Sequence, residues 1–113
     1  MNIEELTLKD TITALFPSGT VATATSGYDQ HIGKPVFIRT VTMNFTGRLV
    51  AVHTGELVID GAAWIADSGR FSAALATGTM NEVEPYPEGP VVVSRAALID
   101  VSAWNHTLPS AVK

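Results

Sequence analysis

The chain has 113 residues, of which 46% are hydrophobic and only 16% are charged, and its formal net charge is −4. This composition is too apolar for a disordered protein, and the length fits a single domain that buries its own core. The acidic balance, with seven scattered basic residues and no basic run, makes nucleic acid an unfavourable partner.

The N-terminal third is predicted to hold a helix followed by a long loop. Apolar residues recur at helical spacing over residues 2–16, and Pro17 ends the pattern, so we expect an N-terminal helix within residues 1–17. Residues 18–34 are rich in Thr, Ser, Gly and Ala, which predicts a long loop or arm, with a short strand at residues 20–25 as an additional element.

The middle of the chain has the pattern of consecutive strands. Residues 35–43 and 45–53 are rich in β-branched side chains, and Asn44 between them is the expected tight turn. A second turn at residues 54–55 leads into a third strand over residues 56–65. Three strands with such short links predict an antiparallel meander.

A short helix is predicted at residues 68–77, after the third strand. Asp67 and Ser68 are its expected N-terminal caps, and Gly78 is expected to end it. Three apolar residues are predicted to share one face of this helix: Phe71, Ala74 and Leu75.

The C-terminal part begins with an acidic segment broken by proline, residues 82–89, whose Glu82 and Glu84 we interpret as a solvated strand edge. Residues 91–104 predict one long bent strand or two short ones, and residues 105–113 predict a polar tail. Five short, bent strands favour a small antiparallel barrel over residues 35–104, because closure removes exposed sheet edges. The predicted fold is therefore a single, mainly β (α+β) domain.

Arginine and aromatic side chains are the candidate binding residues. A guanidinium group beside an aromatic ring suits a planar anionic ligand such as a nucleotide, provided that the fold brings the two together. For each of the two tryptophans, a place in the core is the preferred interpretation, with a pocket or an interface as the alternative. The candidates are Arg39, Arg48, Arg95, Trp64, Trp104 and Tyr28.

Nothing in the sequence indicates catalysis or a cofactor. His31, His53 and His106 lack the spacing of metal ligands and are interpreted as unrelated surface residues, with His53 in a turn. No serine lies in a nucleophile elbow, and no glycine cluster has the spacing of a phosphate-binding loop. Without cysteine there is no thiolate zinc site and no thiol nucleophile. We expect a protein that is not an enzyme.

Part of the chain resembles the Sm-like branch of SH3-like barrels. The segments that carry the resemblance are Phe45–Leu49, an aromatic-x-Gly-x-Leu pattern, and Val92–Arg95 followed by Ile99. His53 and Ala96 stand where that family has an aspartate and a glycine, and no base-reading asparagine is present. The resemblance therefore implies a barrel with an N-terminal helix, and a ring, rather than RNA recognition.

A second resemblance is to a family of small uncharacterised proteins from phage and prophage genomes. It rests on Ile38–Thr42, Phe45–Val50, Ala62–Phe71, Glu82–Pro85 and Gly89–Val91, and it covers most of the chain from about residue 36 onward. This resemblance implies a role in phage biology, but the family has no assigned activity.

These observations lead to a non-enzymatic homo-oligomer as the expected protein, most simply a virion-associated structural or assembly component in contact with other phage proteins. The alternative is a cytoplasmic module that sequesters a small anionic nucleotide signal or blocks a host defence protein, and Sm-like RNA binding is a weaker one. No apolar run approaches the roughly 18 residues of a membrane span, and the N-terminus is acidic, so we expect the host cytoplasm or the virion.

Overall fold

The computed structural model describes residues 26–113. The predicted helix within residues 1–17 and the strand at residues 20–25 lie outside this range. The described elements follow one another in the order η1 (Gly27–His31), β1 (Pro35–Thr40), β2 (Asn44–Val52), β3 (Glu56–Asp67), α2 (Phe71–Thr77), β4 (Glu82–Pro85), β5 (Val91–Ser94), η2 (Arg95–Ala97) and β6 (Leu98–Ala103).

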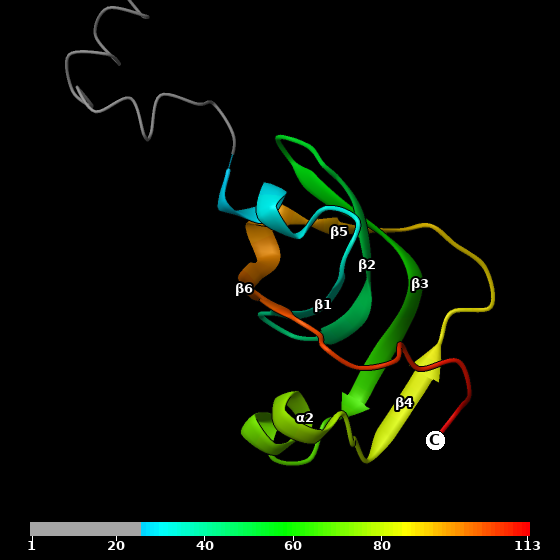
Figure 1. Ribbon diagram of the computed structural model, residues 1–113. Coiled ribbons are helices and arrows are strands. Elements are labelled where there is room, and N and C mark those ends of the chain that lie inside the picture. The colour runs from blue at the N-terminus through cyan, green and yellow to red at the C-terminus, as the bar shows by residue number, and fades with distance from the viewer. Residues whose placement is uncertain (1–25) are drawn as a thin grey trace, which may run out of the picture.

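The strands form one strongly curved antiparallel sheet. β1, β2 and β3 are a meander, β6 pairs with the outer side of β1, and β5 pairs with the N-terminal half of β3. β5 and β6 therefore lie at the two ends of a five-stranded path, yet only the three residues of η2 separate them along the chain. The path consequently curls round on itself, as Figure 1 shows. The predicted small antiparallel barrel is confirmed.

The barrel is filled by apolar side chains that alternate along its strands. Gly47 belongs to this inner row, and a Cβ atom there would lie 3.1 Å from the side chain of Ile59, so the barrel wall accepts no larger residue without a shift. The buried residues of this inner core are Val36, Ile38, Phe45, Leu49, Leu57, Ile59, Ala62 and Val93.

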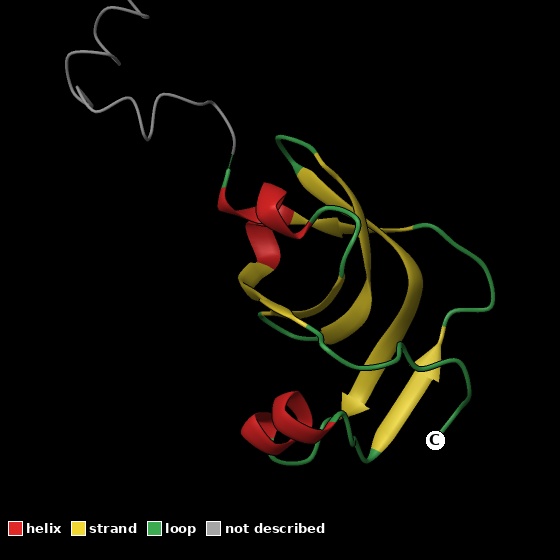
Figure 2. Cartoon of the chain, in the orientation of Figure 1, coloured by secondary structure: helices red, strands yellow, loops and turns green. Residues whose placement is uncertain are grey.

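A second apolar core lies on the outer face of the same sheet. Phe37 on β1, Thr46 on β2 and Ala63 on β3 are cross-strand neighbours on that face, and all three are fully buried. They are covered by α2 and by the C-terminal residues, with Ala74 and Trp104 among the buried contacts. Figure 2 shows α2 set apart from the barrel, beside the end of β3. The structure thus adds an outer layer to the predicted barrel.

The C-terminal tail is part of this layer. Its last residue, Lys113, exchanges two backbone hydrogen bonds with Val83 of β4, at N···O distances of 2.9 and 3.1 Å. Leu108 packs against the outer core. In Figure 1 the red C-terminal segment accordingly runs to β4, which pairs with β3 on its other side.

The first turn of the meander differs from the prediction. Asn44 is the first residue of β2, and the turn comprises residues 41–43. Thr40 holds this turn, because its hydroxyl donates to the Met43 carbonyl at 2.7 Å and accepts from the Met43 N–H at 2.9 Å. A buried threonine with both bonds satisfied locally replaces the asparagine turn that the sequence suggested.

The helix α2 matches the prediction at its end but not at its start. Its apolar face and the left-handed Gly78 after it are as expected, with a φ of 75° at Gly78. However, Arg70 is the N-cap residue, without a side-chain hydrogen bond. Asp67 instead accepts the N–H of Gly69 at 2.8 Å and so stabilises the turn before the helix. β3 extends to Asp67, two residues beyond the predicted end.

The segment of residues 91–104 forms two short strands, β5 and β6, which was one of the two expected forms. Within residues 26–113, no helix is both long enough and apolar enough to pass through a membrane.

Candidate functional site

Arg39 is engaged in an ion pair on the outer face of the barrel. Its Nε atom donates to both carboxylate oxygens of Asp100, on the neighbouring strand β6, at 2.9 and 3.1 Å, and its Nη2 atom also donates to Asp100. The guanidinium lies 4.4 Å from the centre of the Phe71 ring. Hydrogen bonding to Arg39 lowers the pKa of the Asp100 carboxyl, and the same bond raises the pKa of Arg39. This pair fastens α2 to the barrel.

Arg48 and Arg95 are each bound to backbone carbonyls. Arg48 Nη1 donates to Gly33 at 2.7 Å, and Arg95 Nη1 donates to His53 at 2.8 Å. Arg95 also lies over the half-buried Tyr28 ring, 5.0 Å from its centre. These contacts fasten η1 and η2 to the strands, so both arginines have structural partners.

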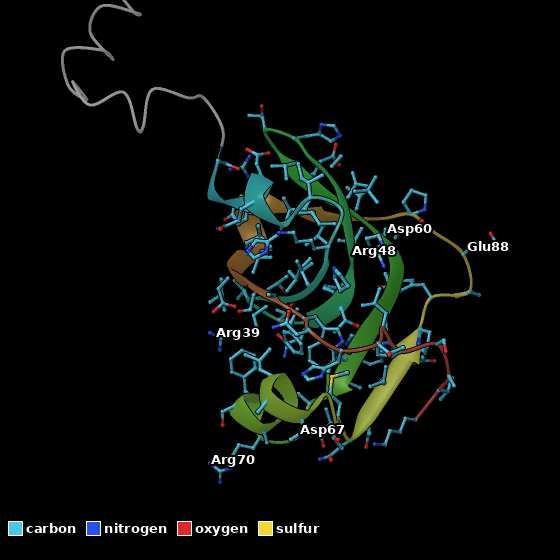
Figure 3. The ribbon with its side chains drawn as sticks, in the orientation of Figure 1. Arg39, Arg48, Asp60, Asp67, Arg70 and Glu88 are labelled. Carbon is cyan, nitrogen blue, oxygen red and sulfur yellow. The ribbon has the colours of Figure 1, made fainter. Side chains whose placement is uncertain are left out.

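Arg39 and Arg48 do not converge on one site. Arg48 lies opposite Pro35 at the start of β1, whereas Arg39 is four residues further along that strand, which corresponds to about 13 Å. Figure 3 shows the Arg39 and Arg48 labels on opposite sides of the barrel. The rings beneath the guanidinium groups are those of Phe71 and Tyr28, rather than of Trp64 or Trp104.

Trp104 is a core residue, as the preferred interpretation had it. Only 1% of its surface is exposed, its ring lies 5.8 Å from Phe37, and its indole N–H donates to the carbonyl of Thr107 at 3.3 Å. Its contacts with Phe37 and Thr107 place it to order the tail.

His106 departs from its interpretation as an unrelated surface residue. It is half-buried, and its ring packs edge-on against Trp104 at 4.9 Å. Its Nε2 atom lies 2.7 Å from the carbonyl oxygen of Leu75 in the last turn of α2, which only a ring N–H can satisfy as a hydrogen bond. His106 thereby ties the tail to α2. His53 lies at the start of the second turn, as predicted.

Trp64 differs from Trp104, because 37% of its surface is exposed. It shares one face of the sheet with Phe45 on β2 and Glu84 on β4, its two cross-strand neighbours. Phe45 is buried in the inner core, so Trp64 is the next residue of that row, beyond the packed interior. Its ring forms part of the wall of an open groove.

The groove has a volume of about 360 Å³ and crosses three segments of the chain. Met43 comes from the first turn of the meander, Trp64 from β3, and the rest from β4 and the residues after it. Its lining residues are Met43, Trp64, Glu84, Pro85, Tyr86 and Pro87. The sequence identified only Trp64 among them, although the aromatic and prolines of the acidic segment were a usable signal.

The groove walls are held by main-chain contacts. The N–H of Tyr86 donates to the Ala62 carbonyl on β3 at 2.9 Å, and its ring lies 6.4 Å from that of Phe45. Met43 is fixed by the hydroxyl of Thr40 described above. The groove is thus built on strands and on a bonded turn, so little ordering is needed when it is filled.

A second surface consists of the outer edges of β5 and β6. Within residues 26–113, β5 pairs with β3 alone and β6 pairs with β1 alone. Each strand carries a large exposed apolar side chain, Val92 on β5 and Ile99 on β6, with exposed fractions of 56% and 59%. Within the same residues, no group of three or more His, Asp or Glu side chains is arranged to hold a metal ion.

No protein-family model and no curated protein matches this chain. Among solved structures, it is similar to a heptameric archaeal Sm protein, with 19% identity, a TM-score of 0.49, and coverage of 66% of this chain and 91% of that one. It is similar to the SmAP1 heptamer of P. aerophilum, with 19% identity, a TM-score of 0.49 and coverage of 66% and 84%. It is also similar to a chain of the NatC complex bound to CoA, with 17% identity, a TM-score of 0.46 and coverage of 72% and 88%.

Proposed function

We propose that the protein is a non-enzymatic homo-oligomer that assembles through the outer edges of β5 and β6, as a structural or assembly component of a phage or prophage particle. The observation that carries this proposal is the pair of strand edges with exposed Val92 and Ile99. Single exposed apolar residues are common, but one on each unpaired edge of a barrel is typical of a surface that another chain covers.

Edge pairing explains why β5 and β6 each carry an exposed apolar side chain. The outer edge of a strand presents unpaired N–H and C=O groups, which are best satisfied by a further strand. Because η2 turns the chain between β5 and β6, the two edges of one barrel do not pair with each other within residues 26–113. Pairing β5 of one copy with β6 of the next is head-to-tail, and such contacts give a closed ring or an open filament.

The phage or prophage setting is supported by the resemblance of the sequence, notably Ala62–Phe71. The alternative of a nucleotide-sequestering module needs arginines gathered around one ligand. Arg39 lies away from Arg48, and the three arginines bind Asp100 and the carbonyls of Gly33 and His53, which gives that alternative less support. RNA binding is disfavoured by the net charge of −4.

The test compares substitutions on and off the edges by light scattering after gel filtration. We expect the native chain to elute as an oligomer, and Val92→Lys and Ile99→Lys to shift it to the monomer, because a charge on an edge strand opposes pairing. Val50→Lys is the matched control, since Val50 is 50% exposed but lies on the central strand β2. A native chain that stays monomeric, or an equal effect of all three variants, would contradict edge assembly.

The structural role has its own readout. The assembled protein is expected in purified particles, or bound to a purified virion protein. If it oligomerises as described but is absent from particles and binds no virion protein, the assembly stands and the structural role is wrong.

A further inference from the structure

We propose that the groove around Trp64 and Tyr86 binds a positively charged, extended peptide segment of a partner protein. The proposal is independent of edge assembly, because the groove lies at the C-terminal half of β3, beside β4, whereas β5 pairs with the N-terminal half.

The apolar part of the groove suits a peptide with flat or short side chains. Trp64, Tyr86 and Met43 are all part-exposed, and together with Pro85 and Pro87 they line a volume of about 360 Å³, at the small end of the range for binding pockets. Aromatic-lined grooves accept extended, proline-containing segments, since these lose little conformational freedom on binding. A shallow groove between a strand and a proline-stiffened loop admits such a segment better than a helix.

The negative charge of the groove favours a positively charged partner. Glu84 lines it directly, and the surrounding residues 82–88 contain three glutamates and no basic residue. Within residues 26–113 the only ion pair is that of Arg39 with Asp100, so the Glu84 carboxylate has no such partner. A carboxylate beside an indole ring is an arrangement that favours a guanidinium or ammonium group, which pairs with the oxygen atoms and lies over the ring.

The same charge decides against a nucleotide or a single-stranded RNA. Bases do stack on tryptophan and tyrosine, but their phosphates need cationic groups alongside the aromatic platform. Here, within residues 26–113, the one charged side chain that lines the groove is Glu84, which repels phosphate, and the neighbouring strand residues are Glu82 and, across β4, Lys113, which pairs with Val83 through its backbone. The observations therefore favour a basic peptide.

The two tryptophans supply the assay. In a two-dimensional ¹H–¹⁵N NMR spectrum each indole N–H gives its own signal, and Trp104, at 1% exposure, serves as an internal reference for Trp64. The probe is a ten-residue peptide of alternating arginine and proline, titrated into the full chain. We expect the Trp64 signal to shift with saturation and the Trp104 signal to stay in place.

Two matched variants test the role of charge. Glu84→Gln is expected to weaken binding about fivefold, the effect of losing one partly exposed ion pair. Glu82→Gln removes the same charge from the same strand but outside the groove, and we expect about twofold or less at physiological salt. Trp64→Ala is expected to weaken binding by about tenfold or more, followed in the same spectra by the backbone amide signal of Tyr86, with a dispersed Trp104 signal as proof that the fold is intact.

Three outcomes would overturn the proposal. In the first, the basic peptide leaves the Trp64 signal unchanged. In the second, a peptide of alternating glutamate and proline, or a short single-stranded RNA, shifts it equally or more. In the third, Glu82→Gln and Glu84→Gln weaken binding alike, which would indicate general attraction to an acidic surface.

Discussion

Gly78 is the position where the local backbone and the tail depend on each other most closely. It ends α2 with a φ of 75°, and a Cβ atom there would lie 2.7–3.0 Å from three atoms of His106. The variant Gly78→Ala therefore combines two costs. The residue is forced into the left-handed region, and the imidazole is pushed away from the carbonyl of Leu75, 2.7 Å from its Nε2 atom.

The two costs have separate magnitudes. A left-handed conformation costs an L-residue about 1–2 kcal/mol. Loss of one hydrogen bond adds about 1 kcal/mol. We expect Gly78→Ala to lower the free energy of unfolding by about 2–3 kcal/mol. Gly33→Ala is the matched control, because Gly33 has a φ of 85° but nothing within 4 Å of the added Cβ, so only the first cost applies.

Urea unfolding, followed by the fluorescence of the buried Trp104, measures these differences. Adding His106→Ala completes a double-mutant cycle. In that background the imidazole is gone and only the Cβ atom of residue 106, 2.9 Å from the added methyl group, still has to move, so the cost of Gly78→Ala is expected to fall towards that of Gly33→Ala. The coupling between the two positions is expected to be about 1 kcal/mol.

The reasoning would be refuted if Gly78→Ala cost no more than Gly33→Ala. It would also be refuted if the effects of Gly78→Ala and His106→Ala simply added. Either result would mean that His106 does not press on the helix end and that the tail is held by other contacts.

Two further predictions concern buried and paired polar groups. Thr46 is fully buried, and its hydroxyl has no hydrogen-bond partner among the described residues. Thr46→Val is therefore expected to raise the free energy of unfolding by about 1 kcal/mol, as measured by urea titration. A loss of stability would mean that the hydroxyl has a partner. Asp100→Asn is expected to destabilise the protein at neutral pH, because Arg39 lowers the folded-state pKa of Asp100 below its ordinary value of 3.8. The difference in the free energy of unfolding between the native chain and Asp100→Asn is expected to be present above pH 3.8 and to be lost as the pH falls through the lowered pKa of Asp100. A difference that does not change with pH would contradict this account.

The barrel was predictable from the sequence because its signals are local. The β-branched runs that became β1 and β2 alternate with a period of two, and the turn at residues 54–55 is marked by glycine. The apolar face of α2 and its end at Gly78 follow from helical spacing and from the need for a left-handed residue.

The outer layer was not predictable, since it depends on contacts between distant segments. The tail is polar and aperiodic, and it is ordered by backbone bonds from Lys113 to Val83 and by the His106 ring, none of which leaves a pattern in the sequence. Arg39 finds its partner Asp100 61 residues away.

The groove was not predictable either, because it also depends on contacts between distant segments. Trp64 alone suggested two uses, core or pocket, and the choice depends on the register of β3 against β4. That register brings residues 84–87 beside Met43, a contact across about 40 positions of the chain. The sequence offered Arg39, Arg48 and Arg95 as ligand-binding candidates, whereas in the structure their guanidinium groups bind Asp100 and the carbonyls of Gly33 and His53.

Backbone amide hydrogen exchange at two protein concentrations is the most direct test of edge assembly. If β5 and β6 pair between copies, their amides, including those of Val92 and Ile99, are expected to exchange more slowly at high concentration and to lose protection on dilution. The amides of β2, which pairs on both sides within one barrel, are expected to be protected equally at both concentrations. Exchange at β5 and β6 that does not change with concentration would contradict assembly through these edges.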